Sequence, residues 1–170
     1  MTLSVTAAKR ALALDLIEKA FAERRPPAVM SDSKQLSDVE HDEVMSFQEL
    51  DWREVGFDLV ERSADAVFWF SPEAFCYYLP GLLAAGIRAG RTDSNAYDAL
   101  VGMLDRSPEP DYWDDFFRPR WTLLTSEEID AVSAWIDWLA LKAPDLAGGD
   151  VRTRLQDTLT LLRWTREGII

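Results

Sequence analysis

The clearest structural signal in the chain is the stretch from residue 71 to residue 80, SPEAFCYYLP. A hydroxyl side chain, a proline and a carboxylate follow one another, an order that suits the N-cap, the first helical position and the first turn of a helix. A helix is therefore expected to begin at Ser71. Because Pro80 lacks an amide hydrogen and clashes with the carbonyl of Cys76, we expect this helix to kink, or to break in two, near Tyr78.

The sequence around this stretch is apolar, and residues 66–87 contain one charged side chain, Glu73. A membrane span is argued against by Pro72, by Pro80 and by the helix start inside the run. We interpret the region as the buried centre of the fold and expect no membrane partner.

Capping signals and helical spacing of apolar residues recur along the rest of the chain. The pairs Ser37 with Glu40 and Thr125 with Glu128 predict capping boxes. One further helix is expected to follow Asp51, and another to run from a cap at Asp150 to about residue 166. Pro144 is expected to close the helix that starts at Thr125.

The predicted fold class is all-α, because no alternating run is long enough to demand a sheet. We expect a compact single-domain bundle of about seven or eight helices over residues 1–170. A chain of 170 residues with 48% hydrophobic side chains is large enough to bury a core of its own.

The sequence contains a single cysteine, Cys76, so an intrachain disulfide is excluded. Its aromatic neighbours favour a small buried hydrophobe over a reactive nucleophile. Asp15 and Glu18 interrupt the first apolar stretch, which argues against a secretory signal and favours the cytoplasm.

The net charge of −12 is unevenly distributed. Residues 31–65 sum to −8 and residues 105–130 to −5, whereas residues 131–170 are balanced. A field of this sign repels phosphate backbones, so no nucleic-acid partner is expected. The acidic stretches are either solvated faces that maintain solubility or surfaces that attract a basic protein.

The second acidic stretch mixes carboxylates with aromatic side chains between residues 111 and 117. Aromatic residues dominate interface hot spots, and neighbouring carboxylates would attract a basic partner. The competing interpretation is that the aromatic side chains anchor a loop to the core. The candidate partner-binding residues are Asp111, Tyr112, Trp113, Asp114, Asp115 and Phe116.

Signals for catalysis are weak. The only histidine, His41, lies among exposed carboxylates without a recognised metal-ligand spacing, and no phosphate-binding loop, nucleophile elbow or metalloprotease motif is found. We predict no catalytic residue, no metal and no cofactor.

The segment 71–80, with Trp52 and Val55 upstream and Leu124–Glu128 downstream, resembles the core of an uncharacterised family of bacterial proteins. The resemblance covers about residues 45–140. It implies a bacterial origin and a small helical domain, and no activity or site residue follows from it.

Three hypotheses about function remain. The leading one is an acidic protein-interaction module, of immunity or antitoxin type, that masks a basic partner. The alternative is a small-ligand-binding protein or enzyme with a cleft near the Pro80 kink that uses Glu73, Tyr77 and Tyr78. A subunit of a larger complex would instead expose a large apolar patch, and the oligomeric state is open.

Overall fold

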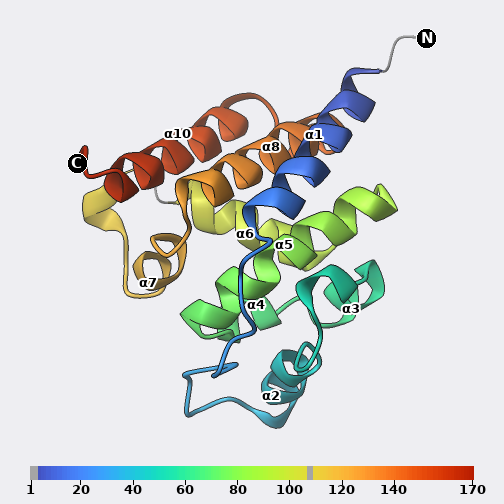
Figure 1. The fold of residues 1–170 in the computed structure, drawn as a ribbon, viewed down its shortest axis with the longest axis vertical. Helices are drawn as coiled ribbons and strands as arrows, with labels where there is room; N and C mark the ends of the chain where they lie inside the picture. Colours follow the sequence, from blue (N-terminus) through green and yellow to red (C-terminus); the bar gives the residue numbers. More distant parts are fainter. Residues whose placement is uncertain (1–3, 107–108) are drawn as a thin grey trace. The chain divides into compact units, whose positions relative to one another are not determined.

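The computed structural model describes residues 4–106 and 109–170, and these residues form helices and no strands. The chain trace is shown in Figure 1. The described residues contain two 3-10 helices, η1 (Trp52–Glu54) and η2 (Pro110–Tyr112), and ten α-helices: α1 (Val5–Ala20), α2 (Asp38–Met45), α3 (Phe57–Arg62), α4 (Ala66–Trp69), α5 (Pro72–Ala89), α6 (Asn95–Asp105), α7 (Phe117–Trp121), α8 (Ser126–Lys142), α9 (Pro144–Ala147) and α10 (Gly149–Arg166). The predicted all-α class is confirmed.

The number of helices is somewhat larger than predicted because short helices follow some of the expected breaks. Pro144 does end the helix before it, but it also occupies the first position of α9, where a missing amide hydrogen costs nothing. The last helix also starts earlier than expected. Its N-cap is Gly148, and Asp150 lies in its first turn.

The chain forms two units, one made of the residues up to Ala22 together with Val101–Ile170, and the other of Glu23–Leu100. We call them unit 1 and unit 2. Helix α6 begins in unit 2 and ends in unit 1. The single domain expected over residues 1–170 stays a prediction.

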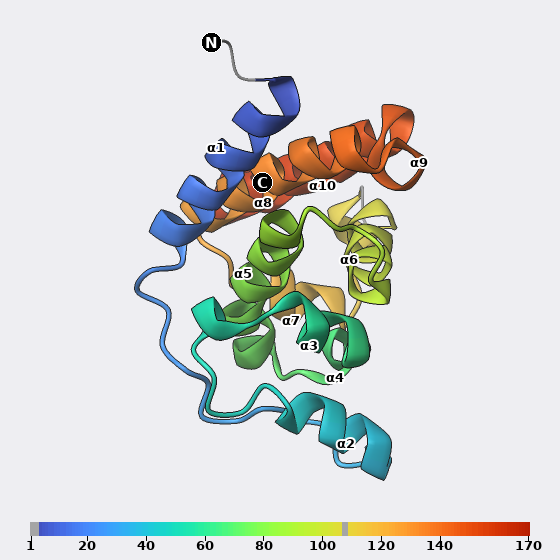
Figure 2. The ribbon, with the colours of Figure 1, turned by 90° about the vertical axis from the view of Figure 1, so that its right-hand side faces the viewer.

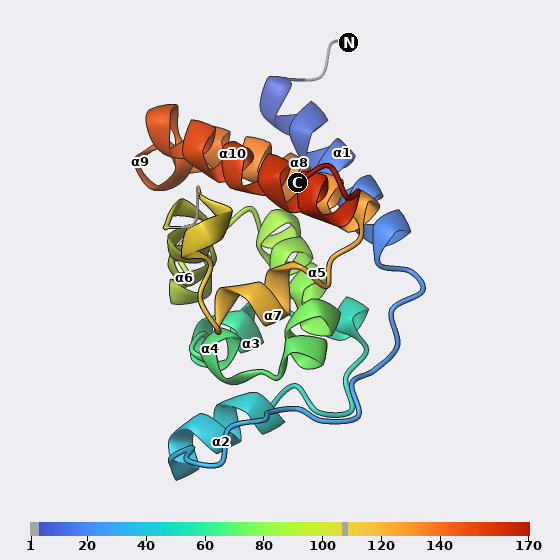
Figure 3. The same cartoon turned by 90° about the vertical axis from the view of Figure 1, so that its left-hand side faces the viewer.

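Unit 1 is built on α8, against which both α1 and α10 pack; Figure 3 shows α10 running along α8. The predicted capping box at the start of α8 is confirmed, because Thr125 accepts the Glu128 amide and the Glu128 carboxylate accepts the Thr125 amide. The apolar residues of α8 from Ile129 to Leu139 are buried.

Unit 2 is built around α5, which packs against η1 and α3, while α2 packs against α4 (Figure 2). All residues from Ala74 to Ile87 are buried. The Ser71 hydroxyl accepts the Ala74 amide at 3.1 Å, and Pro72 starts the helix as predicted. Helix α5 continues through Pro80 without interruption, so the alternative of two separate helices is wrong.

The contact between α5 and η1 depends on Gly81. A Cβ atom at this position would lie 2.5 Å from the Trp52 carbonyl oxygen and 2.9 Å from a Val55 methyl group. Backbone atoms cannot rotate away from such a contact, so the close approach of η1 to α5 requires glycine.

The helix expected after Asp51 is divided into two elements. Asp51 does cap, since its side chain accepts the Arg53 amide at 2.9 Å, but the helix it starts is only the 3-10 turn η1. The backbone is extended at Val55 and Gly56, and α3 begins after them. The apolar spacing continues across this extended pair, which is why periodicity alone suggested one helix.

Cys76 lies in the second turn of α5 and has no solvent exposure. Its position agrees with the interpretation as a small buried hydrophobe. Among the residues that the structure describes, no helix is both long and apolar enough to cross a lipid bilayer.

Candidate functional site

The predicted partner-binding segment lies in unit 1, and two of its aromatic side chains anchor it. Trp113 is 5% exposed and lies 5.4 Å, between ring centroids, from the buried Phe117. Phe117 in turn stacks on Trp121. The interpretation that aromatic residues fix this loop to the core therefore holds for Trp113 and Phe117.

The segment is also held by polar contacts. Asp114 accepts the backbone amides of Phe116 at 3.1 Å and Phe117 at 2.7 Å, an arrangement that starts α7 in the way an N-cap does. The Arg118 guanidinium donates to the Pro110 carbonyl at 2.9 Å. The Asp114 side chain therefore stabilises the backbone of this segment.

The exposed side chains of this segment are Asp111, Tyr112, Asp114 and Asp115, and of these Asp114 is already bound to the backbone amides of Phe116 and Phe117. Tyr112 is 79% exposed, a large value for an aromatic residue. Phe116 is half-buried, and the Arg120 guanidinium lies 4.1 Å from the centroid of its ring. The structure therefore leaves a smaller exposed set here than the six residues predicted.

The residues of the alternative prediction lie on α5 in unit 2, but they do not share one environment. Glu73 is exposed, whereas Tyr77 and Tyr78 are only 2% and 1% exposed. The Tyr78 hydroxyl donates to the Phe47 carbonyl at 2.7 Å and to the Leu50 carbonyl at 3.4 Å. This hydroxyl connects α5 to the loop that follows α2.

Burial and negative neighbours keep both tyrosines in the neutral form. Burial first, and then the Tyr77 hydroxyl and the Asp51 carboxylate, raise the pKa of Tyr78 to about 12. The pKa of Tyr77 is also raised, first by burial and then by the Asp51 carboxylate. A phenol that resists ionisation is a poor general base at neutral pH, which argues against that one role for these two side chains.

A pocket of about 280 Å³ opens beside the two tyrosines. We call it the tyrosine pocket. Glu73 does not line it, so the three residues of the alternative prediction do not form one site. Its apolar lining includes Pro26, Pro27, Leu50, Tyr77 and Tyr78, and its rim carries the carboxylates of Glu49, Asp51 and Glu54.

Two features of this rim stand out. The Glu54 carboxylate accepts the Asp51 amide at 2.9 Å, so these residues also cap η1. Glu49 has a φ of 69° and is the one non-glycine residue with a positive φ among the described residues. The left-handed backbone region is unfavourable for any residue with a Cβ atom. Glu49 adopts it at the edge of the tyrosine pocket.

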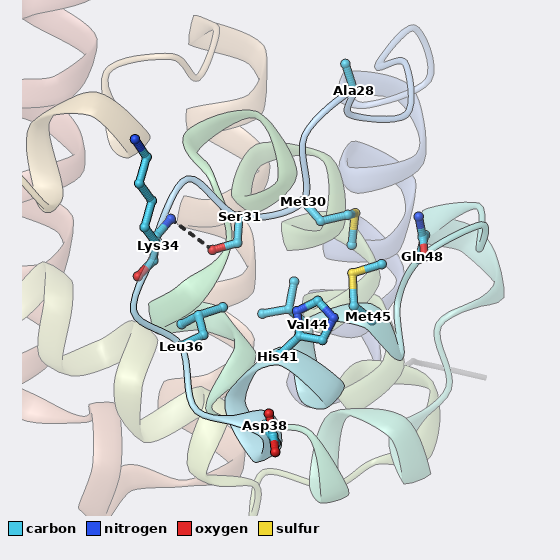
Figure 4. A pocket seen from close by; sticks show the side chains of 11 residues that line it. Ala28, Met30, Ser31, Lys34, Leu36, Asp38, His41, Val44, Met45 and Gln48 are labelled. Atoms are coloured by element: carbon cyan, nitrogen blue, oxygen red, sulfur yellow. Dashed lines mark hydrogen bonds between the residues drawn. The ribbon is translucent and has the colours of Figure 1, made fainter.

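A second pocket, of about 450 Å³, lies between α2 and the irregular segment 28–36 (Figure 4). We call it the methionine pocket. Figure 4 shows the side chains of Met30 and Met45 facing one another across it, with His41 beside them. Val44 is buried and Leu36 half-buried, so the lining is largely apolar in its depth.

The wall formed by α2 follows from helical spacing. Asp38, His41 and Met45 are three and four residues apart and share one face of the helix. The predicted capping box at Ser37 and Glu40 is confirmed and starts this helix. The opposite wall is fixed at one end, because the Ser71 amide and hydroxyl bind the carbonyls of Met30 and Val29.

The two pockets share three lining residues, Ala28, Met30 and Gln48. They therefore form one groove within unit 2, with an apolar end at the methionine pocket and an acidic end at the tyrosine pocket. We call it the groove.

His41 is exposed and lines the methionine pocket. Within residues 4–106 and 109–170, no group of three histidine, cysteine, aspartate or glutamate side chains is placed to hold a metal ion.

Sequence reasoning did not find the groove. Segment 28–36 has no periodicity, and Met30 and Met45 are separated from Tyr77 and Tyr78 by a long stretch of chain. One local signal was present: Asp38, His41 and Met45 follow helical spacing on a short helix whose other faces are acidic.

No protein-family model, curated protein or solved structure matches this chain. The resemblance of segment 71–80 to a bacterial family stays an expectation, and the functional argument depends on the geometry of the chain itself.

Proposed function

We propose that this protein is an interaction module of the bacterial cytoplasm that binds and masks a basic protein, as immunity and antitoxin-type proteins do. Unit 2 supports this proposal with its charge, because residues 23–100 carry fifteen acidic and seven basic side chains, a net charge of −8. Most of this excess lies between residues 31 and 65, which include α2, η1 and both ends of the groove.

The observation that carries the proposal is the rim of the tyrosine pocket. Glu49, Asp51 and Glu54 line it, and no lysine, arginine or histidine does. Burial is the main cause of the raised pKa of Tyr77, and Asp51 and Glu54 raise it further, whereas Arg53, which pairs with Asp51 at 3.3 Å, lowers it. Complementary charge of this kind accelerates association and selects against acidic partners.

The experiment is capture of partners from a bacterial lysate by the full chain at low and at high salt. We expect one basic protein to be retained at low salt and released at high salt, because exposed charge pairs are screened. The captured protein is then purified, and its binding is measured against variants.

The decisive variant is Asp38→Asn with Glu49→Asn, which removes two negative charges at the groove. Its control is Asp145→Asn with Asp157→Asn, which makes the same change of net charge on exposed residues of unit 1. Weaker binding by the first pair alone supports the proposal. Equal loss in both pairs would indicate a general charge effect, and no salt-sensitive basic partner would contradict the proposal.

The exposed part of segment 111–117 is a second surface for the same function. It is tested by Asp111→Asn with Asp115→Asn, and Asp114 is left intact because it supports α7. Loss of binding in this variant, with the groove variant unaffected, would assign recognition to unit 1.

A small-ligand-binding function is the second candidate, and the tyrosine pocket favours it because its volume suits a small cation. Polyamines are the probe, with thermal unfolding as the readout. A stabilisation that Glu49→Asn removes would favour this function over protein masking.

A further inference from the structure

We propose that the groove binds an extended peptide segment of a basic partner, with an apolar side chain in the methionine pocket and a lysine or arginine in the tyrosine pocket. This inference deepens the proposed function and depends on it. It assigns to the groove an occupant and a direction of binding that net charge alone does not supply.

The methionine pocket is suited to an apolar side chain. Met30, Leu36, Val44 and Met45 line it, and its charged or ionisable groups are Lys34, Asp38 and His41. The charges of Lys34 and Asp38 offset one another, so this pocket offers a cation no excess of negative charge, whereas an aliphatic side chain would contact the flexible thioethers, which adapt to different shapes.

The tyrosine pocket is suited to a long cationic side chain. Pro26, Pro27 and Leu50 provide an apolar surface for the aliphatic stem, and the carboxylates of Glu49 and Glu54 lie at the rim for the charged head. Lysine and arginine bind in this way, with the stem on apolar surface and the charge near solvent. Charge complementarity therefore decides which end of the groove takes the cation.

The wall formed by segment 28–36 favours an extended chain as the occupant. Beyond Met30, the hydrogen bonds of residues 31–36 are local ones, from the Ser33 amide to Ser31 and from the Gln35 amide to Ser33. Residues 32–35 are exposed. Apart from the Ser33 and Gln35 amides, which these local bonds occupy, the exposed backbone groups of this segment can pair with an added chain, a common mode of peptide recognition.

An extended peptide sets the spacing of the two anchoring side chains. Successive side chains of a strand point to opposite sides, so two that enter the same groove are separated by one or by three residues. The expected motif is therefore an apolar residue and a lysine or arginine with an odd number of residues between them.

The experiment starts from selection of a random-peptide phage library on the full chain. A selected peptide is synthesised with a fluorescent label, and its affinity is measured by fluorescence anisotropy. We expect basic peptides with the apolar residue and cation at the stated spacing, and hydrogen exchange slowed in residues 31–36 when the peptide is bound.

Two variants test the groove without touching the core. Ala28 lines both pockets and is exposed, so Ala28→Trp obstructs the groove, while Ala89→Trp on α5 is the exposed control. Glu49→Asn removes one carboxylate and keeps a residue that tolerates a positive φ. We expect Ala28→Trp to weaken binding by at least about tenfold and the control to have little effect.

The outcomes separate the two proposals. Basic peptides that bind Ala28→Trp and Glu49→Asn as tightly as the wild type would overturn the groove and leave the proposed function standing. Selection of uncharged peptides that slow exchange in residues 31–36 would overturn the role of the cation and the proposed function but keep the groove. Selection of no peptide would overturn the groove as a peptide site, while capture of a salt-sensitive basic protein would still support the proposed function.

Discussion

Replacement of Gly81 by alanine tests the contact that brings the acidic rim of the tyrosine pocket against α5. The new Cβ would lie 2.5 Å from the Trp52 carbonyl oxygen, in η1. Overpacking of this kind costs about 1–3 kcal/mol, and the backbone oxygen cannot move without the turn that carries Asp51 and Glu54. Alanine also recovers about 1 kcal/mol of helix propensity, so a net loss of up to about 2 kcal/mol is expected.

The matched control is Gly102→Ala in α6. No atom lies within 4 Å of a Cβ at Gly102, so this variant gains the helix propensity without the clash. We expect stabilisation by about 0.5–1 kcal/mol. The two variants are therefore expected to change the free energy of unfolding in opposite directions, although both replace a helical glycine by alanine.

Urea denaturation followed by circular dichroism measures both variants, and thermal unfolding supports it. A shift of about 2–4 °C for each kcal/mol is usual for a chain of this size. If Gly81→Ala were as stable as Gly102→Ala, the close approach of η1 to α5 would be refuted, and with it the placement of the tyrosine-pocket rim.

Three further predictions concern single side chains. Asp114→Ala should lower the free energy of unfolding by about 0.5–2 kcal/mol, because it removes the acceptor that starts α7, whereas Asp115→Ala should change it by less than about 0.5 kcal/mol in the same urea titration. Alkaline pH should destabilise the protein in part through Tyr78, whose pKa of about 12 is above that of an unfolded tyrosine. The stabilising contribution of Tyr78 is complete below pH 10 and is lost between pH 10 and 12. In the Tyr78→Phe variant, the free energy of unfolding should therefore fall less steeply with pH over this range. Burial first and Asp65 second raise the pKa of Glu43, so its charged form destabilises the folded protein. Glu43→Gln should therefore increase the free energy of unfolding at neutral pH and not in acid, where Glu43 is protonated. Urea denaturation at both pH values measures the difference.

The helix starts could be predicted because they depend on neighbouring residues. Ser71, Ser37 and Thr125 each accept an amide three residues ahead, and this spacing can be read directly from the sequence. The break at Val55 and Gly56 could not be predicted in the same way, because it is fixed by the packing of η1 on Gly81 in a distant helix.

The candidate site was predicted only in part for the same physical reason. Tyr77 and Tyr78 were singled out, but what makes a pocket beside them is the return of the chain at residues 26–30 and the acidic turn before η1. These segments are brought there by long-range hydrogen bonds, from Ser71 to Val29 and from Tyr78 to Phe47. No local pattern in the sequence encodes such pairs.

The distribution of charge along the sequence pointed to the part of the chain that holds the groove. The excess of negative charge between residues 31 and 65 lies within unit 2. In segment 111–117 the sequence left two interpretations open, and the structure shows that Trp113 packs inward and that Asp114 binds the backbone. Aromatic residues next to carboxylates are therefore an ambiguous signal until burial is known.

The sealed position of Cys76 gives the protein a built-in reporter of motion. It is the only thiol in the chain and has no exposure within α5, so an alkylating reagent can reach it only when unit 2 opens. Labelling rates across a denaturant series would record the opening of unit 2, while circular dichroism records all helices. If labelling follows global unfolding, the two units open together as one domain; if it occurs at lower denaturant concentrations, unit 2 opens independently.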